Sequence, residues 1–321
     1  MAYLSSGRGL DDYVDWKRDI VFRDTAASSA IKVFFDLAGY VVADGGQTRV
    51  RVYSPSAELI WSRGKPGPGP SEFMRLRSAV RTAGGEVIAL DNAGKLVVYD
   101  SAGNYRTTLR TGLMPTYGVR LLDPSTLLIS GRRAGDLDSP LLHLFDLRTG
   151  SVRSSFFTTP PHPPRFDAAY RFNGWANAAV IGRDTLAVVF ALSDTLYLHR
   201  FDGSPIGKLP LRLRGFRPIR TPAPRNDSPE AEIEWRNSYT TMSDVFPGPD
   251  HSLFVQYFNE KQVELAWGLA RVRLGAGGIE QEFDLPETLR LLGVSLPDYS
   301  LYFLRLDSLE SVTWSVGQIA R

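Results

Sequence analysis

The sequence predicts an all-β fold, and within that class a six-bladed β-propeller with four-stranded antiparallel blades. Three observations support this prediction. Short apolar strands recur in groups separated by polar turns, several strands are apolar on both faces, and no convincing amphipathic helix interrupts them. Strands that are apolar on both faces are typical of sheets sandwiched between other sheets. Repeated four-stranded sheets stacked radially are the most economical arrangement that meets this requirement.

The best-defined repeat begins at Gly39, where YVVAD, VRVYS and ELIWS are three successive predicted strands. The same pattern returns in residues 86–110 as EVIALD, KLVVYD and NYRTTLR. In such groups an apolar strand ends in aspartate, and a short polar loop leads into the next strand. Aspartate at a strand end accepts hydrogen bonds from nearby backbone amides and so favours a turn. Three residues occupy this position: Asp44, Asp91 and Asp307.

Counting these groups gives six units, at roughly 31–76, 77–113, 114–164, 165–215, 238–286 and 287–321. Tyr53, Tyr99 and Phe145 each lead into a turn and are spaced 46 residues apart. The sixth unit stops without an outer strand. Residues 1–30 are polar and irregular except for one strand-like piece, Ile20–Arg23. We expect this piece to supply the missing strand, so that N- and C-terminal strands close the ring.

We expect residues 1–321 to form a single domain. The segment 212–237 interrupts the repeats between the fourth and fifth units, and it is rich in proline, arginine and acidic residues. Two interpretations remain open for it. One is a solvated inter-blade insertion, and the other is a lid or docking loop over one face of the ring.

Residues 64–73, GKPGPGPSEF, resemble the G-x-G-x-G-P-G-E-F crossover of six-bladed β-propellers of the NHL-repeat type, especially those of bacteria. GGEVIALD and KLVVYDSAG are similar to the two strands that follow in that family. Ser71 stands where the family usually has glycine. The resemblance covers residues 39–110 and is specific for the fold, but propellers carry many unrelated activities.

The resemblance also implies a location in the periplasm or cell envelope, because such proteins often carry a signal or lipoprotein leader. The first residues, MAYLSSGRGLDDYVDWKRD, lack the apolar core of a secretory signal. A cytoplasmic location therefore stays open.

The composition excludes several classes of protein. With 37 basic and 35 acidic side chains, the chain has no general field that would hold a polyanion, so we expect no nucleic-acid partner. The absence of cysteine excludes disulfides and thiolate chemistry. No run approaches the roughly 18 apolar residues of a membrane helix. We expect a monomer that binds a protein or small ligand which the sequence does not identify.

Strand order places the loops after Asp44 and Asp91, and the crossover Arg63–Glu72, on one rim of the central channel. Propeller sites usually lie where such loops converge. The candidate ligand-binding residues are the charged side chains expected there: Asp44, Arg63, Asp91, Arg132, Arg165 and Asp307. Each also has a simpler interpretation as a turn-forming aspartate or a solvated arginine.

No catalytic or metal-binding motif is present. The four histidines form no HxH or HExxH pair, and G-x-S-x-G is absent. The favoured interpretation is therefore a non-enzymatic, cofactor-free binding scaffold of the cell envelope. The alternative is a metal-dependent hydrolase, lactonase or lyase with a divalent cation at the channel mouth. Calcium-dependent lactonases on six-bladed propellers hold the cation with oxygen ligands from different blades, and candidates here are Asp44, Asp91, Asn173, Asn177 and Asp307.

Overall fold

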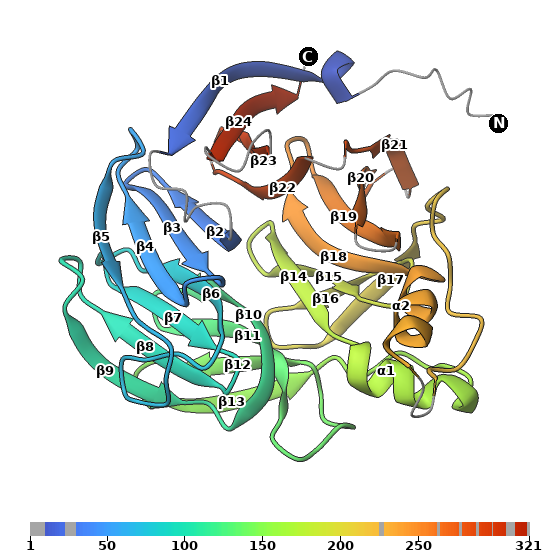
Figure 1. The fold of residues 1–321 in the computed structure, drawn as a ribbon, viewed down its shortest axis with the longest axis horizontal. Helices are drawn as coiled ribbons and strands as arrows, with labels where there is room; N and C mark the ends of the chain where they lie inside the picture. Colours follow the sequence, from blue (N-terminus) through green and yellow to red (C-terminus); the bar gives the residue numbers. More distant parts are fainter. Residues whose placement is uncertain are drawn as a thin grey trace.

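A computed structural model of the chain describes residues 10–22, 30–224, 228–261, 264–275, 278–286, 289–296, 298–305 and 312–319. It contains six four-stranded antiparallel sheets arranged around a ring (Figure 1). This confirms the predicted six-bladed β-propeller. Each predicted unit contains the strands of one blade, and the sixth contains only three, as expected.

The blades follow one another along the chain, each running from its first strand at the centre to its fourth strand at the periphery. Blade 1 contains β2 (Ala30–Asp36), β3 (Gly39–Asp44), β4 (Arg49–Tyr53) and β5 (Leu59–Arg63). Blade 2 contains β6 (Leu76–Arg81), β7 (Val87–Asp91), β8 (Lys95–Tyr99) and β9 (Tyr105–Arg110). Blade 3 contains β10 (Leu113–Asp123), β11 (Thr126–Arg133), β12 (Leu142–Asp146) and β13 (Ser151–Phe156). Blade 4 contains β14 (Ala176–Ile181), β15 (Thr185–Phe190), β16 (Thr195–Arg200) and β17 (Pro205–Pro210). Blade 5 contains β18 (Thr240–Pro247), β19 (Ser252–Lys261), β20 (Glu264–Arg273) and β21 (Gly278–Asp284). Blade 6 contains β22 (Leu289–Val294), β23 (Leu301–Arg305), β24 (Val312–Ile319) and β1 (Val14–Phe22).

The core lies between adjacent blades. Every residue of β3 and of β7 is buried, which agrees with the prediction from their two apolar faces. Val41 of blade 1 and Ala89 of blade 2, for example, belong to one buried cluster that also contains Trp61 and Phe73. Burial of a side chain such as valine contributes about 1.5–3 kcal/mol, so each contact between blades stabilises the ring.

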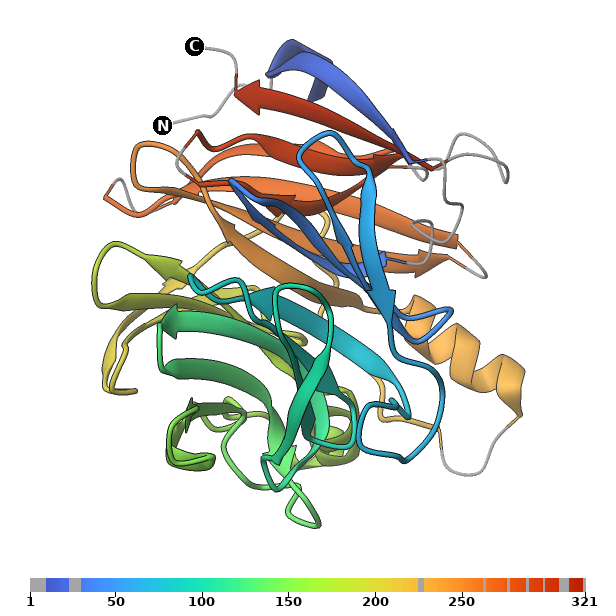
Figure 2. The ribbon, with the colours of Figure 1, turned by 90° about the vertical axis from the view of Figure 1, so that its left-hand side faces the viewer.

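The N-terminal strand closes the ring, as predicted. β1 pairs with β24 in antiparallel register, with Ile20 opposite Trp314. The hydroxyl of Ser315 donates a hydrogen bond to Asp19 Oδ1 at 2.8 Å. β1 begins earlier than the predicted piece, at Val14, and Arg23 lies outside the described residues. Figure 2 shows β1 beside β24 at one edge of the molecule.

The segment 212–237 lies between β17 and β18 and ends in a helix, α2 (Pro229–Asn237). Ser228 caps this helix, with its hydroxyl accepting from the backbone N–H of Ala231. Trp235 is buried, and its indole N–H donates to Thr221 O at 3.0 Å. The segment is therefore anchored to the ring through a buried aromatic side chain, while α2 stands out from one face (Figure 2).

The described residues include short helices that the sequence pattern did not predict. Besides α2, these are η1 (Leu10–Asp12), η3 (Pro164–Phe166) and α1 (Asp167–Asn173). Helices of seven to nine residues span about two turns, which is too short to produce a periodic apolar pattern. In the part of the chain that is described, no helix is long and apolar enough to cross a membrane.

Candidate functional site

The first strand of each blade lies nearest the centre of the ring (Figure 1). Residues of β2, β6, β10, β14, β18 and β22 line a central channel there. Two adjoining cavities lie along this channel, one of about 360 Å³ and one of about 270 Å³. Five residues border both cavities and mark the boundary between them: Lys32, Asn177, Asp244, Phe246 and Leu292. The channel is therefore divided into two parts.

The larger cavity has mainly apolar walls. It is bordered by the C-terminal halves of the first strands, with apolar side chains that include Val80, Val119, Leu121, Phe246 and Val294. Apart from the residues it shares with the smaller cavity, its polar lining side chains are Ser78, Arg120 and Ser130.

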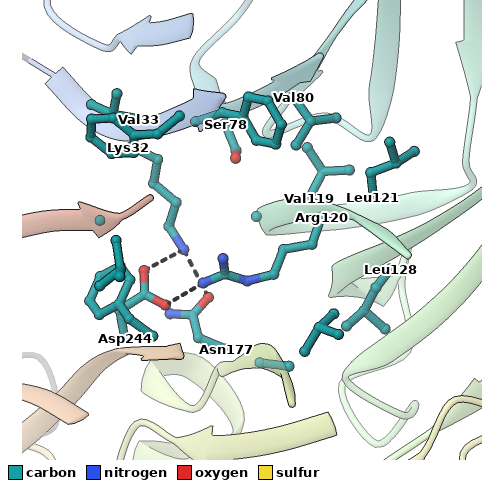
Figure 3. A pocket seen from close by; sticks show the side chains of 18 of the residues that line it. Lys32, Val33, Ser78, Val80, Val119, Arg120, Leu121, Leu128, Asn177 and Asp244 are labelled. Carbon is teal, nitrogen blue, oxygen red and sulfur yellow. Dashed lines mark hydrogen bonds and ion pairs between the residues drawn. The ribbon is translucent and has the colours of Figure 1, made fainter. Parts of the chain in front are cut away.

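Polar side chains meet across the channel between the two cavities (Figure 3). Lys32 Nζ lies 3.0 Å from Asp244 Oδ2 and donates to Asn177 Oδ1, also at 3.0 Å. Arg120 Nη2 donates to the other carboxylate oxygen of Asp244 at 3.0 Å. These four residues, which we call the channel cluster, belong to blades 1, 3, 4 and 5. The cluster therefore links four blades across the ring.

Burial and charge oppose each other in the channel cluster. Burial lowers the pKa of Lys32, and the carboxylate of Asp244 partly offsets this effect. Burial also acts to raise the pKa of Asp244, but the positive charges of Lys32 and Arg120 outweigh it and hold that pKa below its ordinary value. Asp244 is therefore an ionised carboxylate at neutral pH, and two cations already share it.

The smaller cavity has basic walls. Arg77 and Arg290 line it together with Lys32, and Asp244 is the one carboxylate among its described lining residues. Nε and Nη2 of Arg77 both donate to Asn92 Oδ1, at 3.0 and 2.9 Å. A neutral amide thus fixes the guanidinium group of Arg77 without cancelling its charge.

Aromatic side chains form another part of the wall of the smaller cavity. Tyr117 and Trp175 are half-buried, with ring centroids 5.9 Å apart and an angle of 32° between their planes. The guanidinium carbon of Arg290 lies 5.6 Å from the ring centroid of Trp267. Burial lowers the pKa of Arg290, and Asp244 opposes this effect. The smaller cavity thus combines positive charge with flat apolar faces.

β-Bulges direct four residues toward the smaller cavity. In β6, β10, β18 and β22 the register with the second strand shifts by one, which leaves one extra residue on the first strand. The extra residues are Arg77, Tyr117, Ser243 and Leu292, and all four line this cavity. Bulges redirect side chains and are frequent beside functional sites. Four blades therefore contribute to one cavity through the same local irregularity.

The candidates predicted from the sequence lie elsewhere. Asp44 and Asp91 are fully buried within their blades. Asp44 accepts hydrogen bonds from the backbone N–H of Gln47 at 3.0 Å and from Arg51 Nε at 3.1 Å. These contacts match the turn-forming interpretation that the sequence left open.

Asp91 also holds the crossover from blade 1. It accepts hydrogen bonds from the backbone N–H groups of Met74 at 2.8 Å and Arg75 at 3.2 Å. Lys95 Nζ donates to the carbonyl oxygen of Gly69 at 2.7 Å. The loop after Asp91 and the Gly/Pro-rich crossover therefore share one rim, as strand order predicted.

Arg132 is buried and binds backbone carbonyls. Its Nη2 donates to the carbonyl oxygens of Tyr170 and Gly174, both at 3.3 Å, and its Nη1 donates to that of Leu137. Arg132 therefore joins the loop after β11 to the crossover that contains α1.

The two remaining described candidates are exposed. Arg63 Nε donates to Gly103 O at 2.9 Å, and the guanidinium of Arg165 lies 4.8 Å from the ring centroid of Phe166. Asp307 lies outside the described residues. The other five candidates border neither channel cavity, and the structure does not bring them together at one site.

Of the described residues proposed as calcium ligands, only Asn177 borders the channel cavities. The described part of the chain contains no group of three or more His, Asp or Glu side chains that could hold a metal ion. Asp44 and Asp91 bind groups in or next to their own blades, and Asn177 accepts a hydrogen bond from Lys32. The arginines beside Asp244 further disfavour a divalent cation in the smaller cavity.

Most of the residues that line the channel were not predicted from the sequence. Asn177 was considered, but as a calcium ligand. The available signal was a basic residue near the start of a mainly apolar first strand: Lys32 in AIKVFFD, Arg77 in LRSAVR and Arg290 in LRLLGV.

No protein-family model and no curated protein sequence matches this chain. Solved structures match its fold. A member of the DUF4221 family from Bacteroides vulgatus is 11% identical with a TM-score of 0.68, and the match covers 96% of this chain and 98% of the other. A Bacteroides fragilis protein described as a "putative exported protein" is 13% identical with a TM-score of 0.60, and the match covers 98% of each chain.

A more distant match is the β-propeller domain of Cps50 (Swd1) from Myceliophteria thermophila. It is 10% identical with a TM-score of 0.51, and the match covers 92% of this chain and 99% of that domain. At these identities the similarities show the propeller fold alone.

Proposed function

We propose that this protein is a non-enzymatic binding scaffold that takes a small ligand into its central channel, on the basic side of the channel cluster. One observation carries the proposal: bulged residues from four blades converge on a single cavity. A bulge interrupts regular strand pairing, so four bulges at one place favour a role beyond stabilising the ring. The cavity of about 270 Å³ suits a ligand smaller than a typical drug molecule.

A binding role fits these walls better than catalysis does. General acid–base chemistry needs a group with a pKa near the working pH, free to exchange a proton with the substrate. The carboxylate of Asp244 is held ionised between Lys32 and Arg120. The lining instead supplies arginine side chains and aromatic faces, which suit holding a ligand.

The test is a small-molecule screen that follows thermal unfolding and ligand NMR signals. Ser243→Trp places an indole in the smaller cavity, and Ser56→Trp introduces the same side chain on an exposed turn of blade 1. The proposal expects ligands that bind the wild type and Ser56→Trp but not Ser243→Trp. Ligands that bind all three proteins equally would overturn it, as would stoichiometric divalent metal in the purified protein.

We also propose that the protein acts in the cell envelope, as a monomer of the NHL-repeat-like type. The crossover GKPGPGPSEF supports the NHL-like grouping, and the name of the Bacteroides fragilis neighbour supports export. Cell fractionation with an antibody against the protein tests the location, and recovery in the cytoplasm would refute it. Size-exclusion chromatography with light scattering tests the monomer.

A further inference from the structure

We infer that the ligand of the smaller cavity is a small organic anion, a carboxylate or phosphate attached to a flat ring. This inference rests on the proposed function and specifies the class of ligand.

Charge is the first argument. The described residues that line the smaller cavity include three cations, Lys32, Arg77 and Arg290, and one carboxylate, Asp244. That carboxylate also lies 3.0 Å from Arg120 Nη2. The cavity is therefore positively charged even though the chain as a whole is nearly neutral. An anion bound there would offset charges that are costly in a partly dehydrated channel.

The type of cation is the second argument. Arginine presents a planar fork of N–H donors that matches the two oxygens of a carboxylate or phosphate. Nε and Nη2 of Arg77 are occupied by Asn92, which fixes the plane of the group and leaves Nη1 as a further donor. Burial, followed by the nearby charge of Arg75, lowers the pKa of Arg77, and a bound anion would oppose both effects.

The aromatic wall is the third argument. Tyr117 and Trp175 are half-buried and border the same cavity as the arginines. Their centroids are 5.9 Å apart, which is too close for another ring to enter between them, so a ligand ring would stack on an outer face. The anionic group and the ring would then lie side by side, which limits the ligand to roughly the size of benzoate or phenyl phosphate.

The experiment measures binding by isothermal titration calorimetry at low salt. The probes are benzoate, phenyl phosphate, neutral benzamide, non-planar cyclohexanecarboxylate and inorganic phosphate. We expect benzoate or phenyl phosphate to bind at least about tenfold more tightly than benzamide, a difference of about 1.4 kcal/mol. We also expect cyclohexanecarboxylate and inorganic phosphate to bind more weakly than the aromatic anions, and 0.5 M salt to weaken anion binding.

Two variants locate the site. Arg77→Met and Arg290→Met should each weaken binding of the aromatic anion by about tenfold or more. Arg148→Met removes the same charge from an exposed turn and should leave affinity unchanged. Circular dichroism and thermal unfolding check that each variant is folded. If either arginine variant does not fold, the comparison of benzoate with benzamide in the wild type decides the question.

The outcomes separate this inference from the proposed function. Equal affinity for benzoate and benzamide would refute the inference that the ligand is an anion. Unchanged binding in folded Arg77→Met and Arg290→Met would also refute it. If inorganic phosphate binds as tightly as phenyl phosphate, the inference that the ligand carries a flat ring is wrong. If no aromatic anion binds, yet the screen yields neutral ligands that Ser243→Trp loses, the inference fails and the proposed function stands. If Ser243→Trp loses no ligand, the proposed function fails.

Discussion

The ammonium nitrogen of Lys32 lies 3.0 Å from a carboxylate oxygen of Asp244, although the two residues belong to blades 1 and 5. Both side chains are largely shielded from water, with exposed fractions of 23% and 9%. An ion pair in such a place is costly to break because the remaining charge has no solvent to stabilise it. The ion pair therefore contributes to the stability of the ring, and it also borders the candidate site.

Asp244→Asn should lower the free energy of unfolding by about 3–5 kcal/mol, because it leaves Lys32 and Arg120 without their shared carboxylate. Urea denaturation at pH 7 measures this loss. The matched control is Asp184→Asn, whose partner Arg200 lies 2.7 Å away on the surface. Exposed pairs of that kind contribute less than about 1 kcal/mol. Equal effects at the two positions would contradict the prediction.

His143 should make the protein sensitive to mild acid. Its Nε2 donates to Gly131 O at 3.2 Å, so in the neutral ring Nδ1 accepts from the Ser155 hydroxyl at 2.8 Å. Burial lowers the pKa of His143 from 6.5 to about 4. Between these values the unfolded chain binds the proton and the folded chain does not, so stability falls as pH falls through this window.

The difference should be about 3 kcal/mol between pH 7 and pH 4. Urea denaturation at both pH values should therefore show a smaller loss in His143→Gln than in the wild type. His251→Gln, on an exposed turn, controls for the substitution itself. An identical pH dependence in wild type and His143→Gln would rule out the contribution of this buried ring.

Deletion of residues 1–24 should greatly lower the melting temperature, because it removes the fourth strand of blade 6. A milder test uses two neighbouring residues of β1. Ile20 is 7% exposed and Val21 is 59% exposed. Ile20→Ala should cost about 2–4 kcal/mol, whereas Val21→Ala should cost less than about 0.5 kcal/mol. An unchanged melting temperature after the deletion would refute closure by β1.

Arg132→Met should destabilise the fold by about 3 kcal/mol, because it leaves buried carbonyl oxygens without their charged donor. The neighbouring Arg133 is exposed, and Arg133→Met should have little effect. Thermal unfolding of the two variants measures the difference. Similar melting temperatures would mean that the hydrogen bonds of Arg132 contribute little to stability.

The fold was predictable because its signals are local. The apolar strands that end in Asp44 and Asp91 specify a turn and a buried position within a few residues. The closing strand Ile20–Arg23 was predictable by elimination, since the sixth unit lacked one strand. The short helices α1 and α2 were missed because their positions depend on packing of single residues, such as Trp235, rather than on a periodic pattern.

The site was not predictable in the same way. Lys32, Asp244 and Arg290 are far apart in sequence and meet only when the ring closes. Strand order could identify the rim, but the bulges that direct Arg77 and Tyr117 toward the channel leave no mark in the sequence. Asp44 and Asp91 stood out in the sequence because they form turns, which is a structural requirement of their blades.

The pairing of β1 with β24 also determines the order in which the blades can form during synthesis of the chain. Because synthesis runs from the N-terminus, β1 leaves the ribosome before blades 1 to 5, whereas its partner β24 leaves after them, and Asp19 and Ser315 are 296 residues apart. Blades 1 to 5 each form from one continuous segment, whereas blade 6 waits for the far end of the chain. Until then β1 presents an unpaired strand edge, which is a hazard for aggregation. An unfinished or truncated chain therefore displays a free strand that the completed ring conceals.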